Sequence, residues 1–171
     1  MNVNQLSEKE YNSYFKIYLD TLKNVELIEI LKSSFDEFLI VVKNLPEEKL
    51  MSRYAEDKWT IKELIQHLID TERIMSCRAL RFSRNDATEL QGFDENWYVD
   101  YSNGNDRNIT DILEEYNYLR KTSISLFKSF SDEMLINLGT ADGSKMSVRS
   151  LGFIIAGHQL HHLKIMKERY L

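Results

Sequence analysis

The chain has 171 residues, of which 43% are hydrophobic and 29% charged, a balance typical of a single globular domain. Its formal net charge is −5 with acidic and basic residues mixed along the sequence, which disfavours binding to nucleic acid. The longest apolar run, Leu151–Gly157, is too short to cross a bilayer, so no membrane segment is expected. The polar first residues and the single cysteine, Cys77, predict a cytoplasmic protein.

One proline and six glycines leave few helix breakers, and no segment alternates with a period of two residues. We therefore predict an all-α, four-helix bundle in which residues 1–171 form one domain and residues 1–25 an N-terminal extension. This extension carries a short helical pattern near Tyr11–Leu22. The first long helix is predicted from about Glu26 to Asn44, because apolar residues recur there at helical spacing and Pro46 follows.

The second helix begins with the clearest local signal in the chain. Thr60 followed three residues later by Glu63 is a capping box, and the helical pattern continues to about Ser83. A long polar loop then joins helices 2 and 3, from Asn85 to Asn108. Its length is unusual for a compact bundle and suggests a lid or pocket wall. The alternative is a surface excursion packed by its aromatic residues, Phe93, Trp97 and Tyr98.

Thr110 is a candidate N-cap for the third helix, which reaches about Phe130. Ser131 can cap a short turn that leads into the glycine-bearing loop GTADGSK. Ser147 then caps the fourth helix, which is predicted to continue to Leu171 at the end of the chain.

All four histidines fall in the second and fourth predicted helices. At about 100° per residue, His158 and His162 lie about 40° apart, within one apolar stripe of the fourth helix. His161 falls at the shoulder of that stripe, and His67 lies at the edge of the apolar face of the second helix. Two imidazoles buried side by side need polar partners, which a metal ion provides. The alternative for each one is a hydrogen-bonded core histidine.

We therefore expect one divalent metal ion held by His67, His158 and His162, with His161 either a supporting or a surface residue. Three imidazoles suit zinc, nickel, iron and cobalt alike and leave a coordination position open. Gln159 stands where the helical motif of zinc proteases has its general-base glutamate, which argues against a protease.

Several charged residues near these histidines are further candidates. Asp70, one turn beyond His67, could orient a ligand or act as a base, although a solvated carboxylate explains it equally well. Glu95 in the long loop is the other candidate base. Three arginines of the second helix could bind an anionic substrate or be solvated: Arg73, Arg78 and Arg81. Cys77 is predicted to be a passive residue rather than a nucleophile.

Five segments resemble the DinB/YfiT-like superfamily: HLIDTER, ALRFSRND, GFDEN, GTADGSKMSVRSL and AGHQLHHLKIMKERYL. The resemblance covers about Tyr54 to Leu171. It implies a four-helix bundle that is often dimeric, so a homodimer is expected, with a divalent metal on three histidines that match His67, His158 and His162. Members with assigned activities include thiol S-transferases, a thiol-dependent isomerase and proteins labelled metal-dependent hydrolases.

Together these observations predict a metal-dependent S-transferase. A small thiol of the bacillithiol or glutathione class would bind in the open position as thiolate and attack an electrophilic substrate under the Gly92–Tyr98 loop. One alternative is a hydrolase with metal-activated water and Asp70 or Glu95 as base. Another is a non-catalytic metal- or ligand-binding bundle, which a closed site that included His161 would favour.

Overall fold

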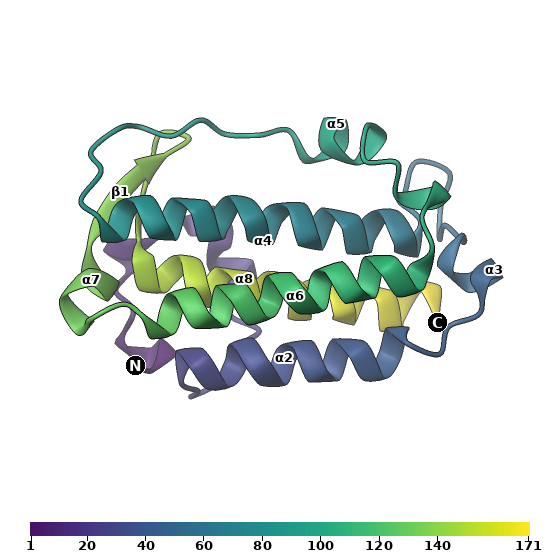
Figure 1. Cartoon of the computed structure of the whole chain (residues 1–171), viewed down its shortest axis with the longest axis horizontal. Helices are drawn as coiled ribbons and strands as arrows, with labels where there is room; N and C mark the ends of the chain where they lie inside the picture. Colours follow the sequence, from purple (N-terminus) through teal and green to yellow (C-terminus); the bar gives the residue numbers. More distant parts are fainter.

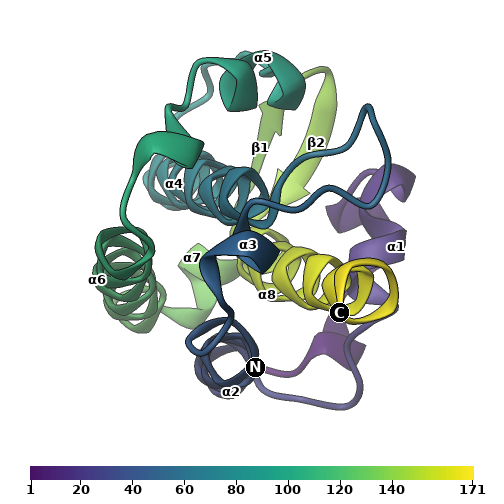
Figure 2. The same ribbon diagram turned by 90° about the vertical axis from the view of Figure 1, so that its right-hand side faces the viewer.

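The computed structural model describes the whole chain, residues 1–171. Four long helices form a bundle, which confirms the expected fold class: α2 (Leu27–Val42), α4 (Ile61–Ser83), α6 (Ile109–Lys128) and α8 (Val148–Ile165). A π-helical turn, Met166–Tyr170, continues α8 almost to the end of the chain. Helix α6 packs against α2 and α4, and α8 packs against the same two helices, so that α2 and α4 lie at opposite corners of the bundle (Figure 2). None of the helices combines the length and apolar character that a membrane span requires.

The long loop is a consequence of the bundle's topology. Helix α6 runs parallel to α4, so the chain must return along the length of α4 before α6 can begin (Figure 1). On the way it forms the short helix α5 (Glu95–Asp100) and a 3-10 turn at Gly104–Asp106. The loop is therefore a structured crossover that lies above α4.

Local capping signals set the ends of the long helices. The capping box at the start of α4 is present as predicted, since the Thr60 side chain accepts from the Glu63 amide and Glu63 accepts from the Thr60 amide. Ser147 caps α8 as expected. The prediction for α6 was wrong by two residues: Asn108 is the N-cap, and its side chain accepts from the amide of Thr110 at 2.8 Å.

The glycine-bearing loop is a β-hairpin, which the sequence did not predict. Strands β1 (Leu138–Ala141) and β2 (Ser144–Ser147) pair antiparallel. The two turn residues, Asp142 and Gly143, both have positive φ, as the tight two-residue turn of a hairpin requires. Four-residue strands are too short to show a recognisable alternation. Two small helices complete the chain, α3 (Glu47–Leu50) and α7 (Asp132–Ile136).

The N-terminal extension is mostly short 3-10 turns, with one turn of α-helix, α1 (Lys16–Leu19), packed on α8. The helix expected near Tyr11–Leu22 is thus shorter than predicted. Gly157 of α8 permits the close contact, because a Cβ there would collide with the Tyr18 carbonyl. An ion pair between Glu10 and Arg149 ties the extension to the start of α8.

A buried polar layer crosses the middle of the bundle, and each long helix contributes one residue to it. Arg120 of α6 is 1% exposed and donates to Glu72 of α4, Ser34 of α2 and Gln159 of α8. One cluster of buried apolar side chains lies on each side of this layer along the bundle axis. Because a buried charge needs complete pairing, the layer fixes the register of the four helices. Gln159 thereby anchors the turn of α8 that carries the neighbouring histidines.

Candidate functional site

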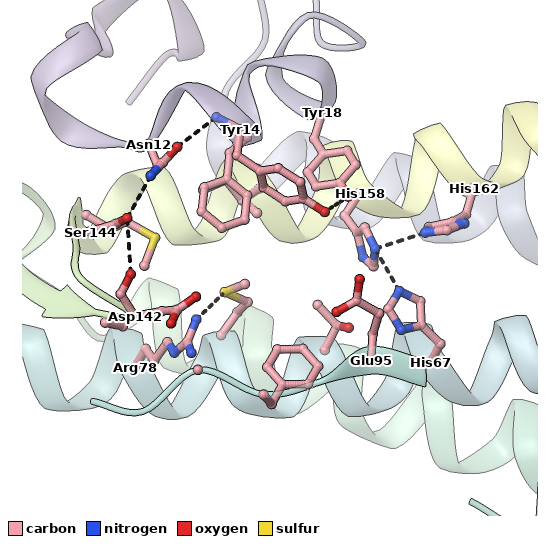
Figure 3. Close-up of a pocket in the computed structure, with 18 of the residues that line it drawn as sticks. Asn12, Tyr14, Tyr18, His67, Arg78, Glu95, Asp142, Ser144, His158 and His162 are labelled. Carbon is pink, nitrogen blue, oxygen red and sulfur yellow. Dashed lines mark hydrogen bonds between the residues drawn. The ribbon is translucent and has the colours of Figure 1, made fainter. Parts of the chain in front are cut away.

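Three histidines from two helices converge at one point. His67 projects from α4, while His158 and His162 project from successive turns of α8 (Figure 3). The Nε2 atom of His158 lies 3.0 Å from Nε2 of His67 and 3.0 Å from Nε2 of His162. One ligand atom from each residue falls within 4.8 Å of the others. The structure thus brings together the three histidines that the sequence singled out.

Burial keeps these imidazoles in the neutral form that binds metals. His67 and His158 are 7% and 5% exposed, and burial lowers the pKa of His67 to about 4. Burial, with the neighbouring histidines, also holds the pKa values of His158 and His162 well below the ordinary value. None of the three histidines forms an ion pair with a carboxylate, so no neighbouring negative charge raises their pKa values.

The donor set fits a divalent metal ion. A neutral Nε2 either donates one hydrogen or accepts one, so three converging Nε2 atoms cannot all satisfy one another. Two nitrogens bound to one tetrahedral zinc ion at about 2.0–2.1 Å lie about 3.3 Å apart, which is close to the 3.0 Å spacings around His158. No acidic side chain joins the cluster. Three nitrogen ligands with no fourth protein ligand are the arrangement of a catalytic rather than a structural site.

The histidines lie at one end of a cavity of about 470 Å³ between α4 and α8 (Figure 3). The N-terminal extension, the start of the long loop and the β-hairpin close its other sides. Its main polar and aromatic lining residues are Asn12, Tyr14, Phe15, Tyr18, Trp59, Thr71, Arg78, Phe93, Glu95, Asp142 and Ser144. A cavity of this volume holds a small organic molecule.

The N-terminal extension forms one wall of the cavity, which sequence reasoning missed. The Tyr18 ring packs edge-on against His158 and His161, with centroids 4.9 and 5.2 Å away. Its hydroxyl lies 3.4 Å from that of Tyr14, and burial raises its pKa, so it stays protonated at neutral pH. Trp59 covers the other side, its ring 4.7 Å from that of His67. Nothing in the local sequence connects residues 12–18 to histidines of the last helix.

The long loop contributes to both of its predicted roles. Gly92, Phe93 and Glu95 line the cavity, and the Glu95 carboxylate points toward His67 and His158 (Figure 3). Trp97 and Tyr98 instead lie on the outer surface, 59% and 38% exposed. The loop is therefore a pocket wall at its start and a surface excursion further on.

Most of the other sequence candidates lie outside the cavity. Asp70 is half-buried on another face of α4, where it accepts from Gln66 at 3.0 Å and lies 3.7 Å from Arg73. Cys77 is exposed. His161 is half-buried and outside the three-histidine cluster. Of the three arginines, only Arg78 lines the cavity, whereas Arg73 and Arg81 form ion pairs elsewhere. Of the two candidate bases, the structure thus brings only Glu95 to the histidines.

Comparisons with known proteins agree with this geometry. A family model described as the DinB superfamily matches residues 30–166. Among solved structures, YfiT from Bacillus subtilis superimposes with a TM-score of 0.75 at 15% identity, over 83% of this chain and 82% of that one. It is described as a probable metal-dependent hydrolase with an unusual four-helix bundle topology. No curated protein matches the chain. The family match spans the bundle and includes all three clustered histidines, and the protein therefore belongs to the DinB superfamily.

Proposed function

We propose that the protein is a metal-dependent enzyme whose site lies at the histidine end of the cavity. One observation carries the proposal: three histidine ring nitrogens converge without a fourth protein ligand, at a point that opens into a space large enough for a substrate. His67, His158 and His162 would hold the ion. A divalent ion bound there would lower the pKa of a thiol or water molecule that entered its open position.

The residues around the histidines suit the handling of a proton. Glu95 is the carboxylate that points toward the site, so it can accept the proton that a thiol or water loses on activation. The Tyr18 hydroxyl stays protonated and can donate to an oxygen that gains charge. Trp59, Phe15 and Phe93 present apolar surface that excludes bulk water from the reacting groups.

Our first candidate reaction is S-transfer from a low-molecular-weight thiol to an electrophile. The family resemblance supports it, as does a cavity that continues well beyond the histidines to a second polar end with room for two reactants. The thiol loses its proton to Glu95, and its sulfur then forms a bond to the electrophilic carbon while the leaving group departs with its electron pair.

Hydrolysis is the second candidate, and two observations favour it. Glu95 could serve as general base for a water molecule, and the structurally similar YfiT is described as a probable metal-dependent hydrolase. The two candidates share one site and differ only in the nucleophile.

The test compares both reactions in one preparation. Metal-loaded protein is assayed for conjugation of glutathione or bacillithiol to monochlorobimane, and for thiol-free hydrolysis of a p-nitrophenyl ester. We expect thiol-dependent conjugation that His158→Ala abolishes and Glu95→Gln lowers by about 10²-fold or more, with His161→Ala as the matched histidine control. Thiol-free ester turnover with the same variant pattern selects hydrolysis. If neither reaction occurs with metal fully loaded, the enzyme proposal is wrong.

A further inference from the structure

The end of the cavity away from the histidines holds a buried arginine without a carboxylate partner. Arg78 is 5% exposed, yet no acidic oxygen lies within the 4.0 Å that defines an ion pair. Its Nη2 donates to the Gln91 carbonyl at 2.8 Å and its Nη1 to the Met75 sulfur at 3.8 Å. The other buried arginine, Arg120, is fully paired by Glu72 and neighbouring oxygens. Arg78 is therefore the buried cation whose pairing is incomplete.

The unused donors of Arg78 are available to a ligand in the cavity. A guanidinium has five N–H donors in a planar fork, and the structure accounts for one good hydrogen bond and one weak contact to sulfur. Burial lowers the pKa of Arg78 from an ordinary value so high that the group still carries its charge at neutral pH. A desolvated cation is costly unless an anion pairs with it, and the fork matches a carboxylate in two-point contact.

Asp142 is a carboxylate that lines the same cavity as Arg78, but it forms no ion pair with the guanidinium. It lies at the exposed tip of the β-hairpin and interacts with Arg78 only through space, beyond ion-pair distance. Water and salt screen such an exposed charge. Asn12 and Ser144 line the same end of the cavity and bond to each other at 2.7 Å, which adds polar groups beside the guanidinium.

The spacing along α4 sets the length of molecule that could reach both ends. Arg78 follows His67 by eleven residues, so both lie on one helix face about 16 Å apart along the axis. The arginine side chain points back toward the histidines, as Figure 3 shows, and shortens the span. A molecule of about tripeptide length, roughly 10 Å, bridges the remainder.

We propose that Arg78 binds a carboxylate of the thiol substrate and so holds the molecule along the cavity with its sulfur at the three histidines. The substrate class is then a small thiol whose carboxylate lies several bonds from the sulfur. This assignment rests on the proposed thiol transfer for the role of the sulfur. The carboxylate site itself stands on the contacts of Arg78 alone.

The binding test uses probes without sulfur. Isothermal titration of the metal-loaded protein is performed with glutarate, with the glutathione analogue that has alanine in place of cysteine, and with the dimethyl ester of that analogue. We expect the carboxylate forms to bind, the ester to bind about ten-fold or more weakly, and Arg78→Gln to lose the preference for the acid. Arg78→Lys should retain part of it. Arg84→Gln is the matched control, because Arg84 is exposed and outside the cavity.

Comparison of acid with ester inside each variant keeps the test valid even if Arg78→Gln is less stable. Absence of saturable binding of both carboxylate probes, or an equal acid preference in Arg78→Gln, overturns the proposal. Carboxylate binding without any thiol conjugation leaves the Arg78 site standing and refutes thiol transfer. Conjugation with the same KM for a thiol and its ester, in both the unsubstituted protein and Arg78→Gln, refutes the Arg78 site and leaves thiol transfer standing.

Discussion

Substitution of His67 by glutamine is expected to reduce the pH dependence of folding stability in the metal-free protein. Burial lowers the pKa of His67 from 6.5 to about 4. The unfolded chain therefore takes up a proton at this residue below about pH 6.5, whereas the folded protein does so only near pH 4. The contribution of neutral His67 to folding stability is therefore fully present above pH 6.5 and is lost as the pH falls toward 4. At about 1.4 kcal/mol per pH unit, protonation of His67 in the unfolded chain lowers the free energy of unfolding at pH 5 by about 2 kcal/mol.

The measurement is urea unfolding with a chelator present, at about pH 7 and about pH 5. The loss of unfolding free energy between the two pH values should be smaller in His67→Gln than in the unsubstituted protein by about 2 kcal/mol. Carboxylates that titrate in this range contribute equally to both proteins and cancel. His161→Gln is the control, because that half-buried histidine is partly solvated and should change the loss much less. An identical pH dependence in all three proteins would refute the reasoning.

Two other substitutions test the site and the bundle. His158→Ala should reduce bound divalent metal from about one ion per chain to nearly none, whereas His161→Ala should retain it; equal retention in both, measured by elemental analysis, would contradict the three-histidine site. Arg120→Met leaves Glu72 buried without a partner and should lower the free energy of unfolding by about 3–5 kcal/mol, or Tm by about 6–20 °C. The double variant Arg120→Met with Glu72→Leu should recover most of this loss in thermal unfolding, and a double variant as unstable as the single one would show that the charge pairing is not the cause.

The sequence by itself determined the features that depend on short-range geometry. The capping box at Thr60 and Glu63 lies within one helical turn, so it can be read without knowledge of the fold. The spacing of His158 and His162 places both on one helix face wherever the helix packs, which is why the pair could be predicted to converge. The same spacing places His161 at the shoulder of that face, and it lies outside the three-histidine cluster.

The tertiary structure decided everything that depends on how distant segments meet. The eleven-residue spacing places Arg78 on the same face of α4 as His67, but only the packing shows that this face lines the cavity, whereas Asp70 contacts Gln66 and Arg73 outside it. Tyr18 belongs to an extension that no local pattern connects to α8, and its place against His158 depends on a close helix contact. Periodicity fixes the angle between two side chains on one helix. It does not fix which side of that helix faces another element, because packing between elements sets that orientation.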